Sequence, residues 1–193
     1  MQLAHQAGLK NIWVSNGYFS PQAFKLIRPY LDAINIDLKF FKEDLYQQIC
    51  QAKLKPILEN LIRIQKSKIW LEVTTLIIPG YTNTKNQLKK IANFIAKKLG
   101  ENTPCHLSRF YPCYKMKNLP PTSLKLMQKA AEIYQKTGLK YVYAGNLEES
   151  SKQNTFCPFC QSPLIIRNQY KIKKLYQNNQ CSQCGEKIKI IID

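Results

Sequence analysis

Short apolar segments alternate with amphipathic segments through the first 146 residues of this chain, and this alternation restricts the folds available to it. Strands alternating with helices form right-handed βαβ units around a parallel sheet. Because an eight-unit barrel needs about 200 residues or more, we expect either an open doubly wound sheet or part of a larger (β/α) barrel. The expected strands span residues 9–15, 33–38, 69–78, 105–110 and 139–144.

Three helices between these strands have recognisable ends. Ser20 precedes Pro21, an order typical of an N-cap followed by the first helical turn. Thr84 and Gln87 have the spacing of a capping box ahead of an apolar stripe. A third helix is expected over residues 122–138. These signals support an α/β organisation.

The composition is that of a globular protein with a strong positive charge. Hydrophobic residues make up 45% and charged residues 21%, which excludes wholesale disorder. The 29 Lys and Arg residues outnumber the 12 Asp and Glu residues and give a formal net charge of +17. Such a charge invites a nucleic-acid hypothesis. The lysines are nevertheless spread as singles and pairs, so we favour a compositional bias over a nucleic-acid partner.

No segment predicts insertion into a membrane or secretion. A bilayer span needs about 20 apolar residues, and the sequence has no such run. The opening MQLAHQAGLK lacks the basic and apolar regions of a signal peptide. We therefore expect a cytoplasmic protein.

Seven cysteines divide into an isolated group and two C-x-x-C pairs. The isolated thiols Cys50, Cys105 and Cys113 suit a reducing compartment. The pairs, separated by twenty residues, have the spacing of a four-thiolate structural zinc site, and a rubredoxin-like iron site is the chemical alternative. We predict a zinc ribbon over residues 156–193 after a polar linker over residues 147–155. The expected metal ligands are Cys157, Cys160, Cys181 and Cys184.

Polar side chains recur at the ends of the expected strands. The carboxyl ends of parallel strands meet at one rim, where α/β proteins bind ligands. No nucleophile elbow, phosphate loop, dinucleotide fingerprint or zinc-protease helix occurs in the sequence, so we assign no catalytic residue. Amide, carboxylate, imidazole and basic groups together suit an amino-acid-like ligand. The candidate binding residues are Asn16, Asp37, Lys39, Glu72, Thr74, His106 and Arg109.

Several longer strings carry a family resemblance that covers essentially the whole chain. They are VSNGY, INIDLKFF, WLEVTTLIIPGYT, HLSRFYPCYKM, NLPPT and GLKYVYAGN, followed by the two C-x-x-C pairs. Together they resemble the radical S-adenosylmethionine (SAM) enzymes of the AmmeMemoRadiSam system, relatives of pyruvate formate-lyase activating enzyme. The resemblance implies a partial (β/α) barrel with a [4Fe–4S] cluster at which SAM is cleaved to a 5′-deoxyadenosyl radical that abstracts hydrogen.

The resemblance also implies roles and partners. It suggests SAM contacts for Asn16, Asp37, Lys39 and His106, with Glu72, Thr74 and Arg109 as further candidates. It makes AmmeMemo system proteins the expected partners.

Two motifs of the family are missing from these residues. The C-x-x-x-C-x-x-C cluster motif and the Gly-Gly-Glu-Pro motif do not occur. We therefore expect an incomplete barrel that lacks N-terminal units, cannot hold the cluster alone, and exposes an apolar sheet edge near residues 12–14.

A second hypothesis treats the chain as a basic binding module. A zinc ribbon on an α/β platform could contact RNA, DNA or a protein partner through cationic and aromatic side chains. The candidates are Tyr170, Lys171, Lys173, Lys174 and Tyr176. We rank this hypothesis below the radical enzyme.

Overall fold

A single parallel sheet forms the larger part of the computed structural model, which describes residues 1–147, 153–168 and 171–189. Its strand order is sequential, β1-β2-β3-β4-β5, and every neighbouring pair is parallel. A doubly wound sheet would reverse its strand order, so the barrel-type arrangement is the correct alternative. The strands are β1 (Ile12–Ser15), β2 (Ala33–Asp37), β3 (Trp70–Ile77), β4 (Cys105–Arg109) and β5 (Val142–Gly145).

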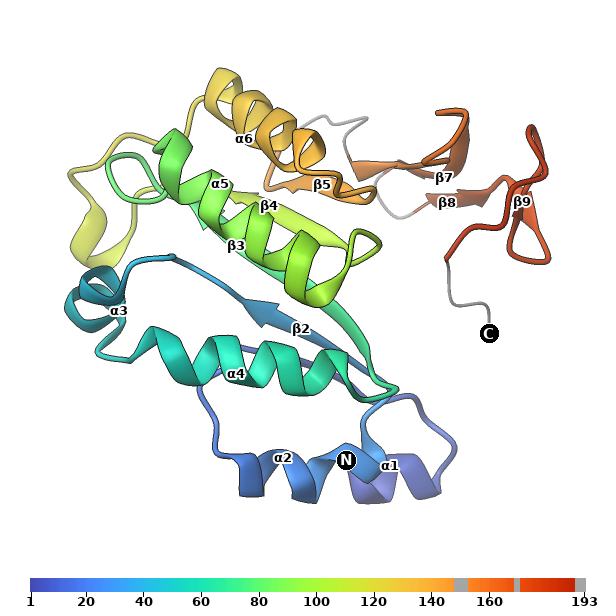
Figure 1. Cartoon of the computed structure of the whole chain (residues 1–193), viewed down its shortest axis with the longest axis horizontal. Coiled ribbons are helices and arrows are strands. Elements are labelled where there is room, and N and C mark those ends of the chain that lie inside the picture. Colours follow the sequence, from blue (N-terminus) through green and yellow to red (C-terminus); the bar gives the residue numbers. More distant parts are fainter. Residues whose placement is uncertain (148–152, 169–170, 190–193) are drawn as a thin grey trace.

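Helices follow the strands and cover one face of the sheet. Figure 1 shows α4, α5 and α6 side by side in front of the strands. Five further residues, Ile95–Leu99, continue α5 as a wider π-helical turn. The helices are α1 (Gln2–Gln6), α2 (Pro21–Ile27), α3 (Glu43–Cys50), α4 (Leu54–Gln65), α5 (Lys85–Phe94) and α6 (Leu124–Lys136), with short 3-10 turns at Arg28–Tyr30 and Tyr114–Met116.

The two faces of the sheet differ sharply in burial. In β3 the burial alternates residue by residue, as the two-residue period of a strand requires. Leu71 and Val73 lie on the buried face against the helices, whereas Glu72 and Thr74 are only half-buried on the opposite face. We call this opposite face the inner face. On β1 to β5 it carries Ile12, Val14, Ala33, Asn35, Asp37, Trp70, Glu72, Thr74, His106, Ser108 and Tyr143.

The predicted helix ends are confirmed in part. The Ser20 hydroxyl accepts a hydrogen bond from the Ala23 N–H, as expected for an N-cap. Thr84 caps α5 in the same way, but the Gln87 side chain accepts from the Phe41 N–H instead of completing a capping box. The tertiary contact therefore replaces the local one.

The expected start of the last helix at Thr122 is two residues too early, since α6 begins at Leu124. Ser123 is the N-cap of α6, since its hydroxyl accepts from the Leu126 N–H. Thr122 is fully buried, and its hydroxyl accepts from the Phe110 N–H and donates to the Ile77 carbonyl. It joins two strand ends rather than beginning a helix.

Two helices without capping signatures fill the interval between β2 and β3. Neither α3 nor α4 has a side-chain N-cap. At the start of α4 the Glu43 carboxylate, 11 residues earlier in the chain, accepts from the Leu54 N–H at 2.9 Å. A cap supplied from another helix leaves no pattern at the helix end itself.

The ribbon has its own strands and its own buried cluster. Cys157, Leu164, Cys181 and Ile188 form that cluster, separate from the main core. Residues 148–152 of the expected linker lie outside the described residues, as do 190–193 of the expected ribbon, and Thr155 belongs to β6 rather than to a linker. The ribbon strands are β6 (Thr155–Phe156), β7 (Pro163–Asn168), β8 (Lys171–Lys174), β9 (Tyr176–Gln177) and β10 (Gln180–Cys181).

The helices were also compared with the dimensions of a bilayer. Across the described residues, no helix combines the length and the apolar character that crossing a membrane requires.

Gly17, which follows β1, offers a test of this packing. Its φ is +75°, and an added Cβ would lie 2.8 Å from Ile36 Cγ2 and 3.1 Å from Ile57 Cγ2. We expect Gly17→Ala to lower the free energy of unfolding by about 2–4 kcal/mol, because left-handed backbone strain adds to overpacking. Urea denaturation followed by circular dichroism measures the loss.

Gly80 provides the matched control. Its φ is +82°, but an added Cβ would meet no atom within 4 Å. Gly80→Ala should therefore lower the free energy of unfolding only through backbone strain, by about 1–2 kcal/mol. Equal losses in the two variants would contradict the close packing under Gly17.

Candidate functional site

A row of polar side chains crosses the inner face of the sheet. Asp37, Thr74, His106 and Tyr143 are register partners on β2, β3, β4 and β5. Thr74 Oγ1 donates to Asn35 Oδ1 at 2.7 Å, which fixes both side chains. The parallel register thus brings together three of the residues predicted from the strand ends, and adds Tyr143, which those patterns did not single out.

Asp37 and Lys39 form an ion pair at the end of β2. Lys39 Nζ lies 2.6 Å from Asp37 Oδ2, with both side chains about one-third exposed. The Lys39 backbone N–H donates to the Tyr46 hydroxyl at 2.9 Å, which holds the chain as it leaves the strand. Tyr46 is buried, and burial raises its pKa well above its ordinary value. The pair presents one acid and one base at the rim.

Glu72 and His106 form a second pair on neighbouring strands. His106 Nε2 lies 2.6 Å from Glu72 Oε2, and Trp70 Nε1 donates to Glu72 Oε1 at 2.9 Å. Burial alone would raise the pKa of Glu72, but the hydrogen bonds from His106 and Trp70 outweigh it and hold that pKa below the ordinary value. The His106 ring also stacks on Tyr143, with ring centroids 5.2 Å apart. The imidazole is therefore held on two sides.

Asn16 lies just beyond β1 and shapes its own turn. Its Oδ1 accepts from the Tyr18 N–H at 2.9 Å, and its side chain is exposed. Below it, buried Asn60 donates to the Gly17 carbonyl at 2.9 Å and to the Phe19 carbonyl at 2.8 Å. Asn60 therefore anchors this turn. In the sequence, this role is indicated only by a polar residue among the apolar positions of α4.

Arg109 does not join the polar row. It is the register partner of Ile77, whose side chain faces the helices. Its Nε donates to the Thr122 carbonyl at 2.7 Å and its Nη1 donates to the Tyr111 hydroxyl at 2.8 Å. Among the residues that the structure describes, its hydrogen bonds hold the loop after β4 rather than a ligand site.

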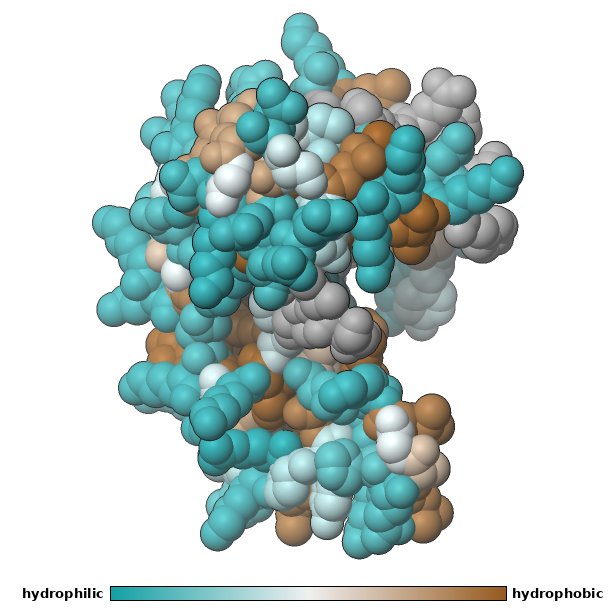
Figure 2. Space-filling view, turned by 90° about the vertical axis from the view of Figure 1, so that its right-hand side faces the viewer, coloured by the Kyte–Doolittle hydropathy of each residue, from teal (hydrophilic) through white to brown (hydrophobic). Residues whose placement is uncertain are grey.

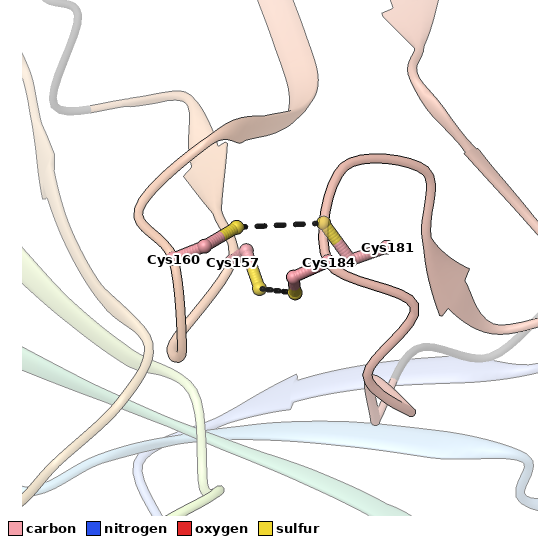
Figure 3. A group of neighbouring side chains, drawn as sticks. All are labelled: Cys157, Cys160, Cys181 and Cys184. Carbon is pink, nitrogen blue, oxygen red and sulfur yellow. Dashed lines mark hydrogen bonds between the residues drawn. The ribbon is translucent and has the colours of Figure 1, made fainter.

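The four cysteines of the ribbon converge as their spacing predicts (Figure 3). Their Sγ atoms all lie within 4.8 Å of one another, and the Cys157–Cys184 and Cys160–Cys181 pairs are each 3.7 Å apart. Tetrahedral zinc with bonds of about 2.3 Å requires sulfur–sulfur distances of about 3.8 Å. This group could therefore hold a metal ion.

Both C-x-x-C turns share one backbone geometry. The Gln161 N–H donates to the Cys157 carbonyl and the Gly185 N–H donates to the Cys181 carbonyl. Gln161 and Gly185 both have positive φ, 61° and 74°, a conformation that glycine adopts without strain. The Ser162 hydroxyl, 3.2 Å from the Cys181 Sγ, and then the backbone N–H groups of the second turn lower the pKa of that thiol, whereas burial and the neighbouring thiols raise the pKa of Cys184 against the hydrogen bond from the Glu186 backbone. A lowered thiol pKa favours the thiolate that binds metal.

The ribbon lies against the inner face beside β5. The Tyr143 hydroxyl is 3.0 Å from Thr155 Oγ1, and the Arg167 guanidinium of β7 lies 5.6 Å from the Tyr143 ring centroid. Lys140 Nζ, before β5, lies 5.8 Å from the Phe159 ring centroid in the first C-x-x-C turn. Sequence patterns did not reveal these contacts, because they join segments with no shared motif.

The residues described do not fit an iron–sulfur cluster of the radical SAM type. Apart from the four ribbon cysteines, no group of three or more Cys, His, Asp or Glu side chains within the described ranges could hold a metal. Cys105 is fully buried and Cys113 is exposed, so these two thiols do not share a cage. The four ribbon cysteines are arranged around a single point.

Two curated proteins of Methanocaldococcus jannaschii are similar to this chain in sequence. The uncharacterized protein MJ0808 is 38% identical over 193 residues, which cover 98% of this chain and 57% of that protein. The uncharacterized protein MJ0674 is 24% identical over 138 residues, covering 68% and 40% respectively. The chain thus spans about half the length of these relatives. No protein-family model matches the sequence.

Solved structures share the fold at low sequence identity. A domain of pyruvate-formate lyase-activating enzyme from Bacteroides vulgatus gives a TM-score of 0.65 at 18% identity, covering 74% of this chain and 84% of that chain. A radical SAM methyltransferase from Sphaerobacter thermophilus gives 0.58 at 13% identity, covering 72% and 42%. Hydroxymethylglutaryl-CoA lyase from Pseudomonas aeruginosa gives 0.50 at 7% identity, covering 71% and 44%. The parallel sheet is therefore similar in fold to these proteins, radical SAM enzymes among them.

The Glu72–His106 pair predicts a pH dependence of stability. Because the folded-state pKa of Glu72 is depressed, the unfolded chain takes up a proton first as the pH falls. The stability from this carboxylate is complete above its ordinary pKa of 4.5 and is lost as the pH falls through the folded value. Glu72→Gln should lower the free energy of unfolding at pH 7 and reduce its decrease between pH 5 and pH 3. Urea denaturation at several pH values measures both.

Glu59 provides a control for this titration. It is half-exposed on α4, where its carboxylate lies 3.9 Å from Lys55 Nζ. Glu59→Gln should leave both the stability and its pH dependence close to those of the unchanged chain. If Glu72→Gln behaved like Glu59→Gln, the pair on the inner face would not be the stabilising interaction inferred here.

Proposed function

We propose that this chain carries the SAM-binding inner face of a radical SAM enzyme of the activating-enzyme type. The observation that carries the proposal is the register of Asp37, Thr74 and His106 across one open face of a sequentially ordered parallel sheet. The strings that resemble the AmmeMemoRadiSam enzymes contain these residues. The structural neighbours named as radical SAM proteins support the same class.

The pair of opposite charges at the end of β2 suits the amino-acid end of SAM. Lys39 offers an ammonium to a carboxylate, and Asp37 offers a carboxylate to an ammonium or to ribose hydroxyls. In the free protein the two side chains neutralise each other. On binding, the carboxylate of a zwitterionic ligand would pair with Lys39, and its ammonium group would pair with Asp37. Bound SAM would supply a 5′-deoxyadenosyl group to this face.

His106 is placed to contact the flat part of the same ligand. Its ring is fixed by Glu72 through Nε2 and by stacking on Tyr143, so its remaining nitrogen and edge are preset for a partner. Asn16 would approach from the turn after β1. Thr74 completes the row through its bond to Asn35.

No reaction step through a [4Fe–4S] cluster is assigned to these residues, because the cysteines present do not fit one. We propose that the four ribbon thiolates hold one structural zinc ion instead. Four cysteine ligands leave no open coordination position, so this metal stabilises the ribbon rather than reacting with a substrate.

The edge of β1 is the proposed contact for further barrel structure. In the described residues β1 pairs with β2 alone, and Ile12 and Val14 are 69% and 72% exposed. An exposed apolar edge strand favours pairing with another strand. We propose that a further barrel segment or an AmmeMemo system protein covers this edge.

The SAM site predicts a ligand-binding difference between two aspartates. Asp37→Asn should weaken SAM binding by at least tenfold, since a charge-assisted contact is worth about 1.5–3 kcal/mol. Asp44→Asn is the matched control, because Asp44 is exposed on α3 and, among the described residues, its ion pair is with Lys42 at 3.5 Å. Isothermal titration calorimetry with SAM measures both. Equal affinities for the two variants would contradict the site.

Binding without cleavage is the companion expectation for these 193 residues. After anaerobic treatment with iron and sulfide and reduction with dithionite, the chain should release no 5′-deoxyadenosine from SAM. Detection of that product by chromatography would show that a cluster forms on these cysteines after all.

The metal assignment is tested by elemental analysis. Aerobically purified protein should contain one zinc ion per chain, and Cys181→Ser should reduce the zinc content and lower the melting temperature. Cys113→Ser is the control, because Cys113 is exposed and lies outside the thiol group. A red protein that contains one iron ion per chain would contradict the zinc assignment and indicate a rubredoxin-like iron site.

The nucleic-acid alternative has no added support. Lys171, Lys173 and Lys174 are exposed on β8, Tyr176 is half-buried, and Tyr170 lies outside the described residues. If the chain binds RNA or DNA regardless of nucleotide sequence, and that binding is lost at physiological salt, the binding reflects charge alone.

A further inference from the structure

A cavity of 430 Å³ lies between the inner face of the sheet and the ribbon. Its walls come from the first residues of β1, β2 and β3, from the chain before and within β5, and from β7 of the ribbon. Figure 2, seen from the ribbon side, shows the molecule hollowed between its upper and lower parts. Neither Asp37 nor Lys39 lines this cavity. It is therefore distinct from the Asp37–Lys39 pair, and of the seven candidate binding residues Glu72 alone lines it.

The cavity has flat aromatic walls. Trp70, Tyr141 and Tyr143 line it, together with the apolar side chains of Ile12 and Ile165. The Trp70 indole N–H is already satisfied by Glu72, and Tyr143 is held by Thr155, so the rings keep fixed orientations. Such walls favour a ligand with a flat or apolar body.

The charges of the cavity favour an anion. Its two carboxylates already have partners, since Asp32 pairs with Lys10 at 3.4 Å and Glu72 Oε2 lies 2.6 Å from His106 Nε2. The positive charge of Arg167 also helps to lower the pKa of Glu72, after the hydrogen bonds from His106 and Trp70. Arg167 and Lys189 add two further cations to the lining. No carboxylate of the described residues lies within 4.0 Å of the Arg167 guanidinium.

Arg167 is a cation held in place by hydrogen bonds to the start of the ribbon. Its Nη1 donates to the Gln153 carbonyl at 2.7 Å and to Thr155 Oγ1 at 2.9 Å, and its backbone N–H donates to Asn154 Oδ1 at 2.7 Å. In the described part of the chain, Nε and Nη2 make no hydrogen bond. A neighbouring cavity of 270 Å³ shares Arg167, Glu72 and Tyr143 and adds His106. The guanidinium and Glu72 thus line both cavities.

We propose that this cavity binds a substrate with a flat apolar body and an oxyanion head, and that Arg167 binds the head. The guanidinium recognises carboxylate and phosphate through the same paired N–H donors. The ribbon is then a specificity element, since its strand β7 supplies the cation. The inference rests on the proposed function only in calling this ligand the substrate.

Binding of simple probes tests the proposal on the zinc-loaded chain. The sequence has two tryptophans, so a Trp13→Phe background leaves Trp70 in the cavity wall as the single fluorescent reporter. Benzoate and phenyl phosphate should each change its fluorescence saturably, and benzylamine should not. The tighter of the two anions identifies the head group. A benzylamine response equal to theirs, or no response to either anion, would overturn the proposal.

Variants in the same background assign the cation. Arg167→Ala should raise the Kd for the tighter anion at least tenfold, with an intermediate effect for Arg167→Lys. Lys173→Ala, an exposed cation on β8, is the matched control and should change the Kd less than twofold. Unchanged zinc content shows that the ribbon of each variant is intact. Equal Kd values for Arg167→Ala and Lys173→Ala would overturn the assignment.

Glu72→Gln gives a test of opposite sign. Removing a negative charge from the cavity wall should tighten anion binding severalfold, whereas a general loss of structure would weaken it. Saturating SAM should not displace benzoate or phenyl phosphate, and displacement would make the cavity part of the SAM site. These titrations need neither a cluster nor SAM cleavage. Failure of SAM binding with intact Arg167-dependent anion binding would therefore refute the proposed function alone.

Discussion

Coverage of the parallel sheet on one face only is the constraint on which the candidate sites depend. Parallel sheets are usually buried on both faces, and their strands then carry apolar residues throughout. Here the helices cover one face, and β3 alternates between buried and half-buried residues along its whole length. The inner face can therefore hold charged groups, provided that each has a partner. Asp37 has Lys39 and Glu72 has His106, both at 2.6 Å.

The ribbon covers part of this open face without merging into the main core. Its buried cluster is small and centres on two of the four cysteines, so a bound metal would replace the hydrophobic contacts that a larger module would have. Contacts with the sheet are polar or cation–π and concentrate at β5, where Thr155 and Arg167 meet Tyr143. The metal would thus stabilise a module whose role is to position β7 over the sheet.

Local patterns predicted the strands and the thiol group, and they failed where a partner is distant. Short apolar segments between helical stretches located all five strands of the parallel sheet to within a few residues at either end, and the C-x-x-C spacing predicted the sulfur cluster. Helix α4 has no capping side chain of its own, because Glu43 of α3 supplies the acceptor. The roles of Asn60 and Gln87 could not be predicted from the sequence either. Asn60 donates to the Gly17 carbonyl and Gln87 accepts from the Phe41 N–H, each more than 40 residues away.

The two arginines show why the cation of the cavity could not be predicted. Arg109 stands at a strand end, where binding residues collect, yet the strand period turns it toward the helix-covered face and the loop that it holds. Arg167 stands in a ribbon strand with no motif around it and reaches the inner face only because the ribbon lies against β5. Strand-end residues of the sheet can therefore suggest the proposed cofactor site, whereas the proposed substrate cavity depends on what covers the sheet. Two proteins with the same polar row on the sheet but different ribbon strands could therefore bind the same cofactor and different substrates.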